Sequence, residues 1–222
     1  MSRTMTRRQL IAGMLASGVA ATTAGLLTAC GQQKAAATAT ATAASSEAAA
    51  ASASTQDETA GGGHVLVAYF SAQGHTKAVA ETAADALGAD LFELVPANPY
   101  SDDDLNWRDD ASRVNAEHND TSLQDVELTQ ATPDGWDDYD AVLLGYPIWW
   151  GGAAWPLSGF VTGNGFAGKT VIPFCTSASS GLGDSASALE QEAGASTWLE
   201  GQRFASDASA DEVTNWAQGL GL

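Results

Sequence analysis

The chain has 222 residues, 45% of them hydrophobic, and its formal net charge at pH 7 is −18. Residues 64–222 contain five Lys or Arg and 24 Asp or Glu, which gives this part a formal charge of −19. Such an acidic surface repels nucleic acid and anionic lipid head groups and favours basic protein partners. The alternative is that the acidity only keeps the protein soluble.

Residues 1–30 have the pattern of an export leader, with basic residues before the uncharged segment 10–29. Thr6-Arg7-Arg8-Gln9-Leu10-Ile11 resembles a twin-arginine export signal, although Leu stands where Phe is common. Leu27-Thr28-Ala29-Cys30-Gly31 resembles a lipobox, and this resemblance implies lipidation of Cys30. An uncleaved membrane anchor is the alternative, since about 20 apolar residues span a bilayer. We expect a lipoprotein at the outer face of the cytoplasmic membrane.

Residues 31–63 consist mostly of Ala, Thr, Ser, Gln and Gly, which predicts a disordered tether. The remaining residues, 64–222, are enough for one domain. Cys30 and Cys175 are the two cysteines of the chain. Because Cys175 ends an apolar run, we expect it to be a small core residue and not a nucleophile.

Apolar runs of strand length alternate with segments of helical periodicity along the domain. Helices are expected after the first strand, from a capping box at Ser101, after Pro156, through Leu189 and from a capping box at Ser209. This alternation predicts an α/β fold with a doubly wound, five-stranded parallel sheet, which binds ligands at the carboxyl ends of its strands. The strands are expected at residues 65–70, 91–95, 141–146, 170–175 and 197–200.

The loop after the first strand, Ser71–Lys77, is small and polar and leads into a helix. This arrangement points free amides and the positive end of a helix at a phosphate group. Ser71, Thr76 and the amides near Gly74 are candidate donors, and Thr76 is the expected N-cap. The loop matches neither G-x-G-x-x-G nor G-x-x-x-x-G-K-[ST]. An ordinary turn between strand and helix is the alternative.

Two further loops should meet the first at the same edge of the sheet. Pro147–Gly152 carries the adjacent Trp149 and Trp150, which are costly to leave in water, so a flat aromatic ligand would explain them. Thr176–Gly183 is small and polar and is suited to hold the other edge of a ring through backbone amides.

Three motifs together resemble the flavodoxin-like family, in particular its single-domain bacterial branch. They are Tyr69-Phe70-Ser71 with Gly74-x-Thr76, Leu144-Gly145-Tyr146-Pro147-Ile148-Trp149-Trp150-Gly151, and Ile172-Pro173-Phe174-Cys175-Thr176 with Ser180-Gly181-x-Gly183. The resemblance implies the strand order 2-1-3-4-5 and noncovalently bound FMN. The residues that it implies for FMN are Ser71, Gln73, Gly74, His75, Thr76, Lys77, Pro147, Ile148, Trp149, Trp150, Gly151, Thr176, Ser177, Ser180, Gly181 and Gly183.

The sequence departs from this family at a few positions. Gln73 and His75 stand where the family often has Thr and Asn, and the third loop lacks the aromatic residue that covers the outer flavin face in many flavodoxins. Nearby carboxylates and a tryptophan wall should lower the reduction potential of the flavin. His64 and His118 fall outside the loops and receive no role, and we expect neither a dedicated catalytic residue nor a metal site.

These observations favour a membrane-tethered FMN electron carrier that serves redox partner proteins with basic surfaces. One alternative is an FMN-dependent oxidoreductase that uses NAD(P)H on quinones or other small acceptors. Another is a binding module that has the fold but has lost the flavin.

Overall fold

The computed structural model describes residues 63–222. The expected leader with its lipidation site and nearly all of the expected tether lie outside these residues. In the described range, no helix is both long and apolar enough to cross a bilayer.

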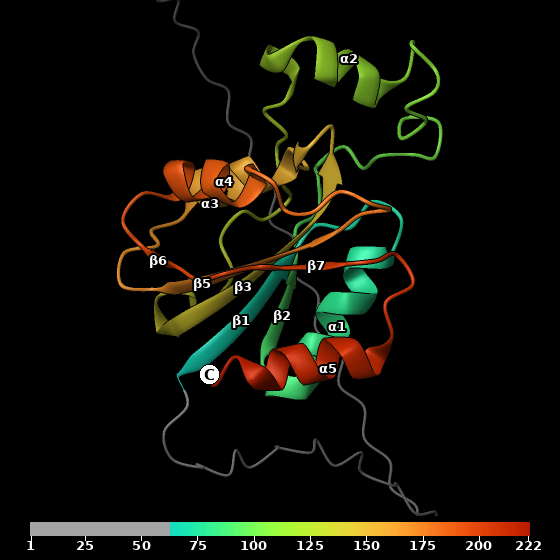
Figure 1. Ribbon diagram of the computed structural model, residues 1–222. Helices are drawn as coiled ribbons and strands as arrows, with labels where there is room; N and C mark the ends of the chain where they lie inside the picture. Colours follow the sequence, from blue (N-terminus) through green and yellow to red (C-terminus); the bar gives the residue numbers. More distant parts are fainter. Residues whose placement is uncertain (1–62) are drawn as a thin grey trace, which may run out of the picture. The chain divides into compact units, whose positions relative to one another are not determined.

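A parallel sheet forms the centre of the domain (Figure 1). Its order is β2-β1-β3-β5 and then β6 and β7, which both pair in parallel with β5. Counted along the chain, this is the predicted order 2-1-3-4-5, so the predicted doubly wound α/β fold is confirmed. The main strands are β1 (His64–Tyr69), β2 (Asp90–Glu93), β3 (Tyr139–Trp149) and β5 (Thr170–Thr176), and the last position is shared by β6 (Thr197–Trp198) and β7 (Gln202–Phe204).

The last strand position was predicted as one strand at 197–200, but it is split into two short pieces. The break at residues 199–201 lies opposite Pro173 of β5, between the pairings of Val171 with Trp198 and Phe174 with Gln202. Proline has no N–H to donate, so the ladder loses a hydrogen bond there. Gly201 fits the gap because a Cβ at that position would collide with Pro173.

Helices cover both faces of the sheet (Figure 1). On one face, α1 (His75–Leu87) packs beside α5 (Ala210–Gly219), and Val79, Val213 and Ala217 are buried there. On the other face, α3 (Pro156–Gly163) packs beside α4 (Ser185–Ala193). The sheet therefore separates two apolar cores, and its strand ends remain available to loops.

The crossover from β2 to β3 differs most from the prediction. The capping box forms, since the Ser101 N–H and hydroxyl both donate to Asp104, at 2.9 and 2.8 Å. Only turns follow it, because Asn106 and Asp109 accept bonds from backbone N–H groups two residues on, which competes with helix formation. The helix α2 (Arg113–Asn119) begins later, after Ser112, and is followed by the short 3-10 helices η1 (Thr121–Leu123) and η2 (Trp136–Asp138).

Candidate functional site

A cleft of about 540 Å³ lies at the carboxyl ends of β1, β3 and β5. Its volume falls in the range that is typical of small-molecule sites. The three predicted loops meet there, and the β2–β3 crossover and the segment after β7 complete the wall. The lining residues are Ala72, Gln73, His75, Leu105, Trp107, Val114, Pro147, Ile148, Trp149, Trp150, Thr176, Ser177, Ala178 and Ser206.

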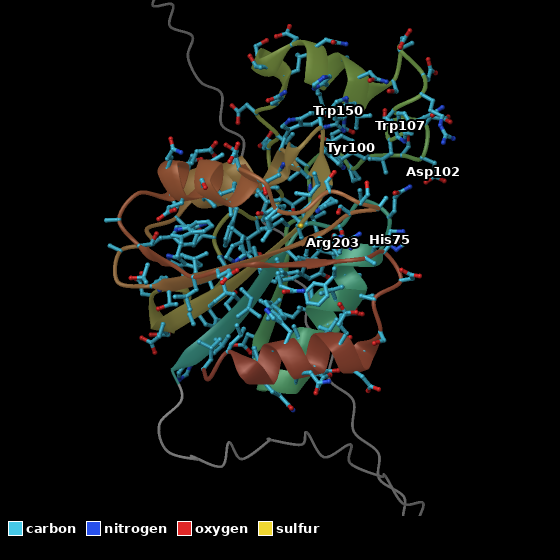
Figure 2. All side chains as sticks on the ribbon, viewed as in Figure 1. His75, Tyr100, Asp102, Trp107, Trp150 and Arg203 are labelled. Carbon is cyan, nitrogen blue, oxygen red and sulfur yellow. The ribbon has the colours of Figure 1, made fainter. Side chains whose placement is uncertain are left out.

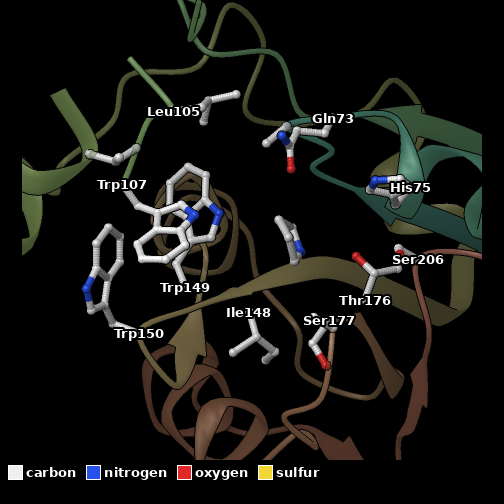
Figure 3. A pocket seen from close by; sticks show the side chains of 14 residues that line it. Gln73, His75, Leu105, Trp107, Ile148, Trp149, Trp150, Thr176, Ser177 and Ser206 are labelled. Carbon is white, nitrogen blue, oxygen red and sulfur yellow. The ribbon is translucent and has the colours of Figure 1, made fainter. Parts of the chain in front are cut away.

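The two ends of this cleft differ in chemistry, as Figure 3 shows. Trp107, Trp149 and Trp150 gather at one end, and Gln73, His75, Thr176 and Ser206 gather at the other. Among the described residues that line the cleft, no side chain is a carboxylate. If nearby carboxylates lower a reduction potential as predicted, they must therefore belong to the acidic surface and not to the wall of the cleft.

The first loop brings the start of α1 to the polar end of the cleft. Gly74 occupies the N-cap position with φ of 86°, a left-handed conformation that suits glycine, and the helix begins at His75. Thr76 is therefore not the N-cap, which corrects the prediction. In the described part of the chain, no acceptor pairs with the amides of His75 and Thr76, whereas the Lys77 N–H donates to Ser71 Oγ at 3.2 Å. Free amides at a helix start suit an anion.

Thr76 lies inside the first turn of α1 with its side chain buried. Its hydroxyl is 2.8 Å from the hydroxyl of Thr176 at the end of β5. Lys77 faces away from the cleft wall, and its ammonium group pairs with Glu93 at 3.0 Å. Thr76 thus supports the loop from behind, and Lys77 is neutralised by a carboxylate outside the cleft.

The second predicted loop is a tight β-hairpin. β3 runs on to Trp149 and pairs antiparallel with β4 (Gly152–Ala153). Trp150 and Gly151 form the turn with φ of 47° and 84°. Positive φ at both central residues is the geometry of a type I′ turn, which is unusual for tryptophan. Both indole rings of the hairpin contact Trp155.

Each ring of this hairpin is held by other aromatic residues. Trp150 stacks with His118 and with Trp155, with ring centroids at 4.4 and 5.7 Å and interplanar angles of 11° and 18°. Trp149 makes edge-on contacts with Phe70, Tyr100 and Trp155. His118 received no functional role from the sequence, and its contact with Trp150 is a structural one.

The third loop is fastened by an arginine that lies outside it. Arg203 of β7 donates from Nη2 to the carbonyls of Ser177 and Ala178, at 2.7 and 2.9 Å, and from Nε to Ser177 Oγ at 3.3 Å. Ser177 Oγ also donates to the Ser180 carbonyl. At the far end of the loop, the hydroxyls of Tyr146 and Ser185 are 3.1 Å apart. The loop is thus fixed at both ends.

Of the predicted site residues, eight line the cleft: Gln73, His75, Pro147, Ile148, Trp149, Trp150, Thr176 and Ser177. The other eight belong to the same loops but not to the lining: Ser71, Gly74, Thr76, Lys77, Gly151, Ser180, Gly181 and Gly183. Three of these residues, Gly74, Gly151 and Gly183, have a left-handed backbone conformation and shape the loops through their backbone.

The β2–β3 crossover also contributes Leu105, Trp107 and Val114 to the cleft, which was not predicted from the sequence. The sequence did offer one indication of this contribution. Trp107 is a large apolar residue in a strongly polar segment, and an exposed apolar side chain of this kind often marks a binding site. Ala72, Ala178 and Ser206 were also missed, and their small side chains give no signal.

The crossover is anchored by a buried polar network at the aromatic end of the cleft. Glu117, 4% exposed, accepts from Arg113 Nε at 2.6 Å and from the Tyr100 hydroxyl at 2.8 Å. The Arg113 guanidinium also lies 3.9 Å from the centre of the Tyr100 ring. Burial, together with the bond to Glu117, raises the pKa of Tyr100. The network holds Tyr100 against Trp149.

Cys175 is fully buried in the core, as predicted. Burial raises the pKa of its thiol to about 11, so the thiolate that nucleophilic chemistry requires is scarce at neutral pH. Within residues 63–222, no cluster of His, Cys, Asp and Glu is arranged to hold a metal ion.

Comparison with known proteins supports the same interpretation. A family model described as flavodoxin matches residues 64–220. Crystal structures of candidate flavoproteins from Bacteroides eggerthii and Bacteroides uniformis are 35% and 36% identical, with TM-scores of 0.65; the matches cover 72% and 71% of this chain and 99% of theirs. A flavoprotein from Lactobacillus acidophilus, in complex with FMN, is 22% identical over 70% of this chain and 99% of its own, with a TM-score of 0.52. No curated protein matches the chain.

Proposed function

Because this chain belongs to the flavodoxin family, we propose that its cleft binds FMN noncovalently and that the domain carries electrons between redox proteins. One observation carries the proposal: a single cleft joins free amides at the start of α1 to a wall of indole rings. FMN has a phosphate at one end and a flat ring system at the other. The polar and aromatic ends of the cleft match these two groups.

At the polar end, the residues of the first loop would hold the phosphate. The amides of His75 and Thr76 and the positive end of α1 favour a negative group. The His75 and Gln73 side chains line the same end and supply further donors. Because Lys77 is paired with Glu93, this site depends on neutral donors and the helix and not on a free lysine.

At the other end, Ile148 and Trp149 provide an apolar wall for the ring, while Ser177 supplies a polar group from the third loop and Thr176 lies at the polar end (Figure 3). FMN, when bound, supplies the redox chemistry, while the protein supplies binding, orientation and electrostatics. The formal charge of −19 on residues 64–222 disfavours further negative charge on the reduced cofactor, so it should lower the reduction potential.

The same acidity suits partners with basic surfaces, because opposite charges accelerate encounter and the effect falls with ionic strength. Transfer to such a partner should therefore slow as salt is added. Rates that do not change with salt would argue against electrostatic steering.

Titration with two flavins tests the binding proposal. We expect the purified protein to be yellow and, after removal of the flavin, to quench the fluorescence of added FMN. Riboflavin, which has the ring but no phosphate, should bind more weakly. A colourless protein that quenches neither flavin would overturn the proposal and would favour a binding module without cofactor.

A second measurement separates a carrier from an enzyme. The FMN-loaded protein should oxidise NAD(P)H only when a reductase partner is added. Steady oxidation of NAD(P)H by the protein alone, with a quinone or another small acceptor, would instead favour an oxidoreductase.

For its location, we propose that the domain is tethered by lipid on Cys30 at the outer face of the cytoplasmic membrane, after twin-arginine export. That route carries folded proteins, which suits a domain already loaded with cofactor. C30S should release the protein from the membrane fraction, and the double variant Arg7→Lys with Arg8→Lys should keep it in the cytoplasm. Membrane association that survives C30S would favour an uncleaved anchor.

A further inference from the structure

The three tryptophans of the cleft differ in how much ring face they leave free. Trp150 is 46% exposed, but its ring already stacks with His118 and with Trp155. Trp149 is partly buried and is enclosed by edge-on contacts with three aromatic rings. Neither hairpin tryptophan therefore offers a fully open face to a flat ligand.

Trp107 is different. It is 63% exposed and lies within stacking distance of no aromatic ring in the described part of the chain. One contact covers part of it, the guanidinium of Arg108 at 4.8 Å from the ring centre. An indole that is so exposed at the wall of a cleft keeps a large apolar area in contact with water. Packing a ligand against the ring would remove this area from water and would therefore be favourable.

The backbone that carries Trp107 is held in place. The Asn115 side-chain amide of α2 donates to the carbonyls of Trp107 and Asp109, at 2.9 and 2.7 Å. α2 is in turn tied to the domain by the bonds of Glu117 to Arg113 and Tyr100. Figure 2 labels Trp107 on the crossover, and Figure 3 shows it at the same end of the cleft as Trp149 and Trp150. The backbone at Trp107 is therefore held in place by hydrogen bonds to α2.

We propose that Trp107 packs face to face against the flavin ring and takes the part of the aromatic residue that the third loop lacks. The proposal rests on the proposed function and adds a specific residue from a different element, the β2–β3 crossover. Asn115 is the positioning residue, because it bonds the carbonyl of Trp107 and does not itself line the cleft. The Arg108 guanidinium lies over part of one face of the indole, at 4.8 Å from the ring centre.

The test uses the full chain and two ligands, FMN and riboflavin. W107A should raise the Kd of both flavins by the same factor, about two- to tenfold, because both carry the ring. The ratio of the two Kd values should stay that of the wild type, and the visible circular dichroism of the bound flavin should change. W107F, which keeps an aromatic face, should recover most of the affinity.

Two further variants separate stacking from a collapse of the crossover. N115A should move the circular dichroism and the Kd in the same direction as W107A, but by less. L123A removes another exposed apolar side chain of the crossover, 50% exposed and away from the cleft, and should change neither.

The outcomes distinguish this inference from the proposed function. If the wild-type chain binds no flavin, both are wrong. If it binds FMN and W107A behaves as L123A does, only the assignment of Trp107 is wrong. If W107A weakens FMN but not riboflavin, Trp107 acts on the phosphate end, and stacking on the ring is again excluded.

Discussion

The hydroxyl groups of Thr76 and Thr176 lie 2.8 Å apart and are buried, so they join the first turn of α1 to the end of β5 beneath the cleft. Two loops that are 100 residues apart in sequence are held at a fixed separation by this one bond. The bond therefore ties the third loop to the first beneath the polar end of the cleft, where the phosphate is proposed to bind (Figure 3).

Replacing Thr76 by valine should therefore affect both stability and ligand binding. The change keeps the shape of the side chain but leaves the buried Thr176 hydroxyl unpaired, which costs about 1–3 kcal/mol. We expect that loss in urea unfolding of the apoprotein, with weaker FMN binding. Thr82→Val on the exposed side of the same helix is the control, and equal losses in both variants would contradict the role of this bond.

Gly145 lies in β3 directly beneath the ring of Phe174, and a Cβ there would overlap the ring. Because both residues are in the buried sheet, G145A should destabilise the domain by about 1–3 kcal/mol through overpacking. The measurement is the urea midpoint at constant m-value. Gly165→Ala, where a Cβ meets no atom within 4 Å, should stay within about 0.5 kcal/mol of the wild type.

The sheet could be predicted because its strands are continuous apolar runs, such as 141–146, which no surface segment would carry. The three loops followed from the topology, since the ends of parallel strands meet at one edge. The same logic could not show that Trp150 turns a hairpin, because tryptophan has no preference for positive φ.

The crossover could not be predicted, because its order depends on contacts that are distant in sequence. The buried pair of Glu117 and Tyr100 is one example, and the bridge between Pro96 and Leu128 is another. The capping box at Ser101 led to the wrong prediction of a helix, because it closes one turn that does not continue as a helix. These contacts place Trp107 at the cleft, so its position could not be predicted from the sequence pattern.

Low pH should weaken the hydrogen bonds between Ser101 and Asp104 at the start of the crossover. The Ser101 backbone N–H and hydroxyl donate to Asp104 and lower the pKa of that carboxyl below its ordinary value of 3.8. A lowered pKa means that the contribution of Asp104 is present above the unfolded value and is lost as pH falls through the folded one. Amide exchange at Ser101, corrected for its intrinsic rate, should therefore accelerate as the pH falls below the ordinary carboxyl value of 3.8.

Two variants check this assignment. Asp104→Asn should show fast exchange at Ser101 already at neutral pH, whereas Asp103→Asn should behave as the wild type. An Asp104 carboxyl that titrates at 3.8 or above would refute the prediction.

The third loop should depend on Arg203, whose guanidinium bonds two of its carbonyls and a hydroxyl. R203M keeps the apolar stem but removes all three bonds, so hydrogen exchange over residues 176–184 should increase and FMN should bind more weakly. R203K keeps the charge, but its single ammonium group cannot reproduce the planar fork, so we expect only partial recovery. Arg108→Met removes an arginine that makes no contact with this loop and should leave its exchange unchanged. Equal protection of the loop in R203M and the wild type would mean that its own short bonds, such as that between Ser177 and Ser180, are sufficient to hold it.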